Sequence, residues 1–124
     1  MPAGALPNFY MNIKGIGVDI IEVKRFRKIP YKKGSAFYQK VFTDREIKYC
    51  LSKSDPYPHF AARFAAKEAV AKAACLHVYK ANKIEVYNDR DGHPLVRSRL
   101  IKGKILLSIS HTQDHAIAFV IFTK

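Results

Sequence analysis

The chain has 124 residues, of which 48% are hydrophobic, and its 22 Lys and Arg against 10 Asp and Glu give a formal net charge of +12. This length suits one domain that buries a core without disulfides or metals, and the hydrophobic content excludes a disordered chain. The charge favours a polyanionic partner: nucleic acid, an acidic membrane or protein, or a phosphorylated metabolite. No apolar run reaches the roughly 18 residues that cross a membrane.

The chain is predicted to consist of a short N-terminal extension and one domain. Residues 1–10 lack the basic start and apolar centre of a secretory signal. We therefore expect residues 1–12 to be a leader or a poorly ordered extension, and residues 13–124 to form a single domain. Cys50 and Cys75 have no metal-ligand spacing and are expected to be reduced core residues, as in a cytoplasmic protein.

Residues 13–21 are predicted to form the first strand. Gly15 and Gly17 leave room there for another backbone or a ligand to approach closely. Asp19 interrupts an otherwise apolar part of the strand, where aspartate is disfavoured. Asp19 is therefore either a cap for the helix that follows or a carboxylate kept for function.

A short basic helix follows the strand and ends before Pro30. Its charge indicates either a solvated face or a docking surface for an acidic helix or nucleic acid, which would act mainly on association rate. A second short helix is predicted for residues 36–41. Thr43 and Glu46 form a capping box that begins a third helix, through about Ser52. The basic residues are Lys24, Arg25, Arg27 and Lys28.

The most informative stretch is residues 60–76, which is rich in alanine, contains no Gly or Pro and is predicted to be one long helix. Its apolar side chains fall on two faces, so most of the helix should be buried. Between those faces lie Arg63, Lys67, Glu68 and Lys72. Three positive charges and one negative charge cannot neutralise one another, which indicates an anion site with a carboxylate available for a metal. The same spacing also fits a solvated helix edge with i, i+4 pairs.

The last third of the chain changes from helices to strands. Residues 88–92 contain the Asn, Asp and Gly of a hairpin turn, and residues 111–115 join two further strands. Helices grouped before hairpin-connected strands predict an α+β domain in which an antiparallel sheet packs against the long helix. The predicted strands are residues 83–87, 93–97, 105–110 and 116–122.

Two groups of residues suggest chemistry. Mg²⁺ commonly takes one or two protein carboxylates together with water and substrate phosphate, so Asp19 and Glu68 form a candidate metal–phosphate site. His111 and Thr112 lie where a predicted strand ends. His111 is either an ordinary surface residue or a group that donates to a phosphate or moves a proton near neutral pH.

Taken together, these residues resemble holo-acyl-carrier-protein synthase, the small bacterial-type branch of the 4′-phosphopantetheinyl transferases. The resemblance covers residues 13–122 and rests on five blocks in the family's order. Any one block is unspecific, whereas all five in order are specific. The blocks are Gly-Ile-Gly-Val-Asp-Ile-Ile-Glu-Val-Lys-Arg (15–25), Val-Phe-Thr-Asp-Arg-Glu (41–46), Arg-Phe-Ala-Ala-Lys-Glu-Ala-Val-Ala-Lys-Ala (63–73), Gly-His-Pro (92–94) and Ser-Ile-Ser-His-Thr (108–112).

The resemblance implies transfer of 4′-phosphopantetheine from coenzyme A to a serine of apo-acyl carrier protein, with release of 3′,5′-ADP, in support of fatty acid biosynthesis. It also implies the 4′-phosphopantetheinyl transferase fold and a homotrimer with active sites between subunits. In such a reaction the serine oxygen attacks the β-phosphorus of the pyrophosphate. Positioning and electrostatic stabilisation should therefore dominate catalysis.

Matching position by position, the resemblance implies roles for individual residues. Asp19 and Glu68 are expected to hold Mg²⁺, and Lys72 to offset charge on the pyrophosphate or leaving group. Glu68 or a metal-bound water is expected to be the general base, so that Glu68 and Lys72 are the catalytic residues. The basic cluster around Arg25 matches the family's docking helix for the carrier protein. The expected contacts of coenzyme A are Arg63, Lys67, Lys72, His111 and Thr112.

One segment departs from the family. After the long helix the family usually has Phe-Gly-Thr-Gly, whereas residues 74–77 here are Ala-Cys-Leu-His. The missing glycines alter the backbone contacts with coenzyme A, and Lys80 or Lys83 is expected to replace a lost phosphate contact. Two other interpretations are a nucleic-acid-binding module, which leaves Asp19 and Glu68 unexplained, and a family member that has lost activity.

Overall fold

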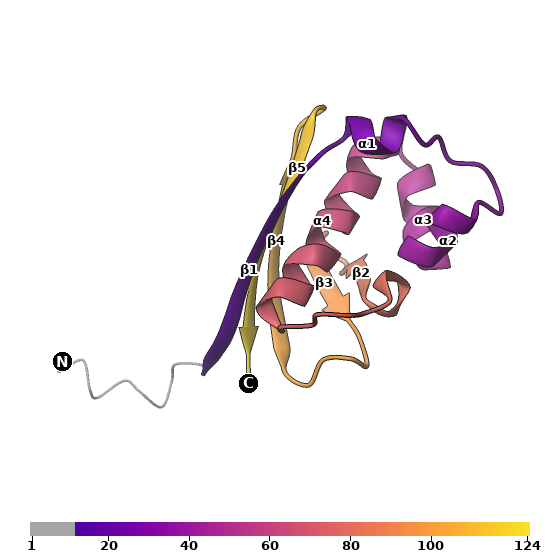
Figure 1. The fold of residues 1–124 in the computed structure, drawn as a ribbon. Coiled ribbons are helices and arrows are strands. Elements are labelled where there is room, and N and C mark those ends of the chain that lie inside the picture. The colour runs from indigo at the N-terminus through magenta and orange to yellow at the C-terminus, as the bar shows by residue number, and fades with distance from the viewer. Residues whose placement is uncertain (1–11) are drawn as a thin grey trace.

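The structure is a computed structural model that describes residues 12–124; the extension predicted for residues 1–12 lies, apart from Asn12, outside the described residues. The long helix α4 (Tyr57–Ala73) crosses the middle of the domain (Figure 1). A three-stranded sheet covers one side of α4, and the short helices lie on the other side. The α+β fold predicted from the sequence, with an antiparallel sheet against a long helix, is confirmed.

In the three-stranded sheet, each strand runs antiparallel to its neighbour. Along β5, Ala116, Ala118 and Val120 are buried against α4, whereas the residues between them face away from it, as the two-residue period of a strand requires. Asp19 pairs with the buried Ala118 in the register, so its side chain lies on the face of the sheet that covers α4. Its strand is at the edge of the sheet. In spatial order the strands are β1 (Ile13–Glu22), β5 (His115–Thr123) and β4 (Lys104–His111).

The two glycines of β1 allow this strand to lie directly against α4. A Cβ atom on Gly17 would stand 2.0 Å from the carbonyl oxygen of Ala69, and one on Gly15 would stand 2.0 Å from that of Ala73. Both distances are far inside van der Waals contact, so only glycine fits. The close approach predicted at these positions is confirmed, and the approaching backbone is that of α4.

Helix α4 begins at Tyr57, earlier than predicted, because Pro58 is tolerated in the first turn, where its missing N–H has no partner to lose. Its middle is buried on almost every side, and its last turn ends at Ala73. Within residues 12–124, no helix combines the length and the hydropathy needed to span a membrane.

Three short helices and an aromatic cluster pack against α4. The predicted capping box is present: the Thr43 side chain accepts from the Glu46 N–H, and Glu46 accepts from the Thr43 N–H. Phe26, Tyr38 and Phe60 are buried together in this layer. The helices are α1 (Lys24–Arg27), α2 (Ala36–Val41) and α3 (Asp44–Leu51).

The hairpin predicted around residues 88–92 forms a sheet of its own. Within residues 12–124, strands β2 (Glu85–Asn88) and β3 (Pro94–Arg97) pair only with each other. A short 3₁₀ helix, η3 (Ala81–Lys83), leads into β2. Regular structure therefore fixes both ends of the segment that joins α4 to η3.

The end of α4 shows how the chain turns without the family's glycines. The Leu76 N–H bonds to the Ala71 carbonyl and the Cys75 N–H to the Lys72 carbonyl, the two hydrogen bonds of a Schellman motif. Cys75 adopts the left-handed conformation that this motif requires, with a φ of 56°. Its thiol is free and exposed, so the prediction that Cys75 is a core residue is wrong, whereas Cys50 is buried as predicted.

Cys75→Gly is expected to raise the free energy of unfolding by about 1 kcal/mol, because the left-handed conformation strains every residue that has a Cβ atom. Urea unfolding followed by circular dichroism measures the change. Cys75→Ala is the matched control, because it removes the thiol and keeps the strained backbone. An equal shift for both variants would attribute the effect to the thiol and contradict the prediction.

Candidate functional site

Asp19 and Lys72 meet beside the edge strand β1. The Lys72 ammonium donates to Asp19 Oδ1 at 3.2 Å and to the Val18 carbonyl at 3.0 Å. The Asp19 side chain is 19% exposed, whereas that of Lys72 is 56% exposed. The carboxylate is therefore fixed and largely desolvated, while the ammonium remains accessible to a ligand.

Glu68 lies one turn before Lys72 on α4, where it is half-buried. The Tyr79 hydroxyl donates to Glu68 Oε2 at 3.0 Å. Burial and then the hydrogen bond to Glu68 raise the pKa of Tyr79 above its ordinary value, with further contributions from the charges of Glu68 and Asp19. Both carboxylates that are predicted to bind metal therefore contribute to the raised pKa of Tyr79. The structure brings Asp19, Glu68 and Lys72 into one cluster, hereafter the carboxylate cluster.

A cleft of about 420 Å³ opens beside this cluster. The end of α4 and the segment that replaces the family's glycines both line this cleft. Its walls include Glu68, Lys72, Cys75, His77 and Tyr79. A neighbouring groove of about 650 Å³ shares Tyr79 with the cleft and is lined by Lys80 and Lys83. The phosphate contact expected from one of these lysines stays a prediction.

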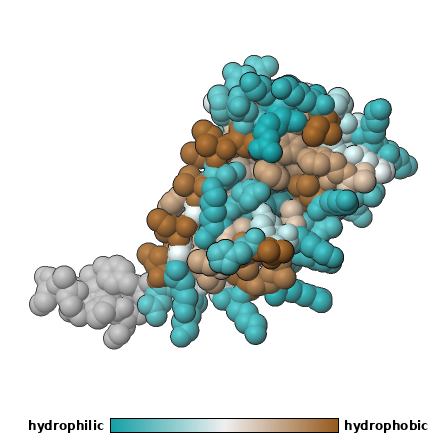
Figure 2. All heavy atoms as spheres, viewed as in Figure 1, coloured by the Kyte–Doolittle hydropathy of each residue, from teal (hydrophilic) through white to brown (hydrophobic). Residues whose placement is uncertain are grey.

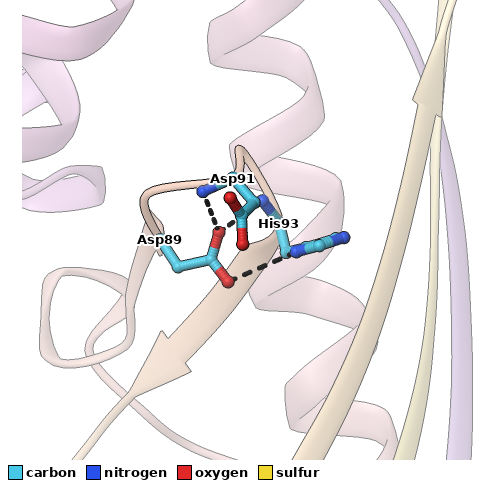
Figure 3. Close-up of side chains that lie close together, drawn as sticks. All are labelled: Asp89, Asp91 and His93. Carbon is cyan, nitrogen blue, oxygen red and sulfur yellow. Dashed lines mark hydrogen bonds and ion pairs between the residues drawn. The ribbon is translucent and has the colours of Figure 1, made fainter.

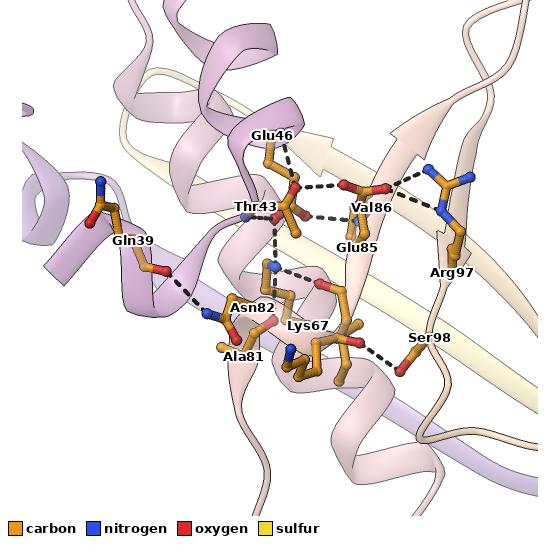
Figure 4. A network of polar contacts seen from close by, with 12 residues as sticks. Gln39, Thr43, Glu46, Lys67, Ala81, Asn82, Glu85, Val86, Arg97 and Ser98 are labelled. Atoms are coloured by element: carbon orange, nitrogen blue, oxygen red, sulfur yellow. Dashed lines mark hydrogen bonds and ion pairs between the residues drawn. The ribbon is translucent and has the colours of Figure 1, made fainter. Parts of the chain in front are cut away.

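Lys67 occupies a position quite unlike that of Lys72. Its side chain is 0% exposed, and its three N–H groups donate to Glu46 Oε1 at 2.6 Å, the Ala81 carbonyl at 3.0 Å and the Ile84 carbonyl at 2.5 Å (Figure 4). Glu46 Oε2 accepts from the Val86 N–H at 2.8 Å. Lys67 has neither a free donor nor exposed surface for coenzyme A. The burial of Lys67 therefore contradicts the contact with coenzyme A that was predicted for it.

Arg63 points from α4 into a second cavity, of about 160 Å³. Its guanidinium lies 3.9 Å from the centre of the Tyr49 ring and donates to the Asn88 side chain. Its Nε is buried with no hydrogen-bond partner among residues 12–124. Arg63 and Glu68 are five residues apart, about 140° around the helix axis, and their cavities share no wall residue. The structure does not bring Arg63 to the carboxylate cluster.

His111 lies near Arg63, in the wall of the same cavity. Its ring packs edge-on against that of His59, with centroids 4.9 Å apart. Burial, and then the charge of His111, lower the pKa of His59 below its ordinary value. Thr112 makes the following turn, where its Oγ1 accepts from the N–H groups of Asp114 and His115. Arg63 and His111 form the basic cluster of the second cavity, which suits an anion, whereas Thr112 lines an adjoining cavity together with His59 and His111.

The predicted docking helix α1 presents exposed charges around one buried anchor, Phe26. Arg27 makes two hydrogen bonds to the Asp55 carboxylate, at 3.1 and 2.7 Å, and Lys24 pairs with Glu22 at 3.2 Å. Arg25 lies over the Phe64 ring at 5.7 Å, and neither it nor Lys28 has an acidic partner among the described residues. Arg25 on α1 and Lys28, which directly follows the helix, are thus the charges available to a partner.

Another acidic group, formed by Asp89, Asp91 and His93, lies in the turn between β2 and β3 (Figure 3). Asp89 Oδ1 accepts from the N–H groups of Asp91 and His93, each at 2.9 Å, and Asp89 Oδ2 lies 3.3 Å from His93 Nδ1. All three side chains are exposed. These bonds account for the group as the internal support of a tight turn.

Sequence reasoning missed several residues of these sites. Tyr79, His59 and Asn88 carry no motif and no metal-ligand spacing, and each reaches its partner from another element. Glu46 was identified only as half of a capping box. Its partner Lys67 lies 21 residues away, so no local signal connected the two.

Comparison with known proteins agrees with the resemblance drawn from the sequence. The family model described as the 4′-phosphopantetheinyl transferase superfamily matches residues 15–120. A holo-[acyl-carrier-protein] synthase of Thermodesulfovibrio yellowstonii is 49% identical over 114 residues, which cover 90% of this chain and 99% of that protein. That of Chlorobaculum tepidum is 43% identical and covers 86% and 96%.

Comparison with solved structures finds the same family. The holo-(acyl-carrier-protein) synthase of Bacillus anthracis, in complex with CoA (3′,5′-ADP), superposes with a TM-score of 0.80 at 32% identity, and the match covers 93% of this chain and 99% of that one. The extent and level of identity, the fold and the family model all agree. The chain belongs to the 4′-phosphopantetheinyl transferase superfamily, in its holo-[acyl-carrier-protein] synthase branch.

Proposed function

We propose that this protein transfers 4′-phosphopantetheine from coenzyme A to a serine of apo-acyl carrier protein, with Mg²⁺, and releases 3′,5′-ADP. The observation that carries the proposal is the carboxylate cluster, in which an accessible Lys72 pairs with Asp19 and lines a cleft together with Glu68, one turn earlier on α4. The relatives are named for this reaction, and one relative of known structure is in complex with CoA. We assign the reaction to fatty acid biosynthesis in the cytoplasm.

The donor set suits Mg²⁺, which prefers carboxylate oxygens and keeps positions for water and phosphate. Asp19 uses one oxygen for Lys72, and Glu68 uses one for Tyr79, so each carboxylate retains an oxygen for a metal. When bound, the ion would offset the charge of the coenzyme A pyrophosphate. In the described residues the positive charge of Lys72 already offsets part of the carboxylate charge.

Two side chains of the cluster, Glu68 and Lys72, would act directly in the transfer step. The serine oxygen forms a bond to the β-phosphorus, and the bond from that phosphorus to the oxygen of 3′,5′-ADP breaks. Glu68 takes the serine proton, and Lys72, whose side chain is 56% exposed, donates to the departing phosphate. Because this transfer needs little covalent help from the protein, the main requirement is correct placement of both substrates.

We infer that the complete site forms between copies of the chain, in a homotrimer. Figure 2 shows hydrophobic side chains gathered along β1, where Ile16 is 65% exposed; Phe119 of β5, on the same outward face of the sheet, is 42% exposed. A contiguous apolar face of this kind is typical of an interface. We expect a neighbouring copy there to supply the basic cluster of the second cavity to the carboxylate cluster, because the structure does not bring these two clusters together within one copy. Light scattering measures the assembly.

Arg25→Glu is expected to raise the KM for acyl carrier protein about tenfold or more and to leave the KM for coenzyme A unchanged. Arg25 is exposed on α1 and has no acidic partner among the described residues, so a reversed charge there repels an acidic partner without disturbing the core. Lys102→Glu, in the exposed loop before β4, makes the same change in net charge and should alter neither constant. Equal losses for both substrates would contradict a docking role.

Mass spectrometry of apo-acyl carrier protein, after incubation with this protein, coenzyme A and Mg²⁺, tests the proposed function. We expect a mass gain of one phosphopantetheine that EDTA prevents. A gain that persists in EDTA would overturn the metal requirement alone. With a folded enzyme and a competent carrier, absence of any gain would overturn the transferase assignment.

A further inference from the structure

We propose that Tyr79 is a positioning residue that holds Glu68 ready for metal, an inference that rests on the proposed function. Among the described residues, the Tyr79 hydroxyl is the one hydrogen-bond donor to the Glu68 carboxylate, at 3.0 Å from Oε2. The Lys72 ammonium likewise donates a hydrogen bond to Asp19 Oδ1, at 3.2 Å. Each predicted ligand thus has one oxygen held by a neighbour and one oxygen free.

The surrounding chain determines where Tyr79 lies. On one side of it, the chain leaves α4 through the left-handed Cys75. On the other side, η3 is tied to the core because the buried Lys67 ammonium donates to the carbonyls of Ala81 and Ile84. The segment between these two fixed points is short, which keeps the Tyr79 hydroxyl at Glu68 of α4; Tyr79, like Leu76, lines both the cleft and the neighbouring groove.

The hydrogen bond has a definite consequence for Glu68. An unrestrained glutamate at a half-buried helix position samples several rotamers, and ordering it on metal binding costs conformational entropy. The bond from Tyr79 to Oε2 removes much of that freedom beforehand and leaves Oε1 available to a metal. Residues that orient metal ligands in this way typically contribute roughly 10- to 100-fold in metal affinity.

The test is titration of the full-length protein with Mn²⁺, in the absence of coenzyme A, followed by the electron paramagnetic resonance of free Mn²⁺. We expect Tyr79→Phe, which keeps the ring and removes the hydroxyl, to weaken Mn²⁺ binding about tenfold. Its urea midpoint should stay at the wild-type value, because the packing of the ring is retained. Tyr87→Phe is the matched control: Tyr87 lies on β2, outside the walls of the cleft.

Glu68→Gln in the same titration separates the two proposals. If Glu68→Gln loses Mn²⁺ binding while Tyr79→Phe binds like the wild type, the positioning role is overturned and the metal site stands. If Glu68→Gln binds Mn²⁺ as tightly as the wild type, the metal site in the proposed function is overturned, and the role of Tyr79 with it. Weakening by Tyr79→Phe and Tyr87→Phe alike would attribute the effect to general loosening and also overturn the positioning role.

Discussion

Replacing Lys67 with methionine is expected to lower the free energy of unfolding by about 3–5 kcal/mol. The substitution removes one member of a fully buried ion pair and leaves the Glu46 carboxylate without its positive partner, 2.6 Å away in the wild type. It also leaves the carbonyls of Ala81 and Ile84 without a donor. Urea unfolding at one fixed protein concentration measures the loss, because an assembling chain gains stability with concentration.

Two further variants isolate the cause. Lys102→Met makes the same substitution at an exposed lysine and is expected to change stability by no more than about 0.5 kcal/mol. Combining Lys67→Met with Glu46→Gln should recover part of the loss, because a neutral amide no longer leaves a charge buried. A Lys67→Met protein as stable as the Lys102→Met control would show that the pair contributes nothing.

Asp19→Asn and Glu68→Gln are each expected to reduce kcat at least about 100-fold, because each removes a negative charge that the proposed Mg²⁺ requires. Both substitutions preserve shape and an acceptor oxygen, so the contacts with Lys72 and Tyr79 survive and the fold is retained. The measurement is the single-turnover rate of phosphopantetheine transfer. Asp91→Asn, in the exposed turn before β3, removes the same charge away from the cleft and should transfer at the wild-type rate.

A mixing experiment extends this prediction to the proposed trimer. His111→Ala removes a residue of the second cavity, and Glu68→Gln one of the carboxylate cluster. His111→Ala, like Glu68→Gln, is expected to lower activity. If neighbouring copies complete each site, oligomers co-assembled from the two variants contain some sites with both native residues. Such mixtures should regain part of the activity. Activity no greater than that of the separate variants, in proven mixed oligomers, would place all site residues within one copy.

Much of the fold was predictable because its signals are local. The capping box of Thr43 and Glu46, the two-residue alternation of β5 and the alanine-rich run of α4 each lie within one element. The predicted bounds of α4 were displaced toward the C-terminus. The predicted helix begins at residue 60, although Pro58 fits the first turn of a helix, and the left-handed Cys75 gave no sequence signal comparable to a glycine.

The sequence by itself determined the α+β fold, a close approach to the first strand at Gly15 and Gly17, and the presence of two carboxylates in apolar segments. Only the tertiary structure decided that Lys72 faces solvent beside Asp19 while Lys67, on the same helix, is buried against Glu46. The physical reason is that helical spacing orders side chains around one axis, whereas burial depends on which distant segments pack against each face. Tyr79 reaches Glu68 for that same reason: its place is set by the two anchored ends of its segment.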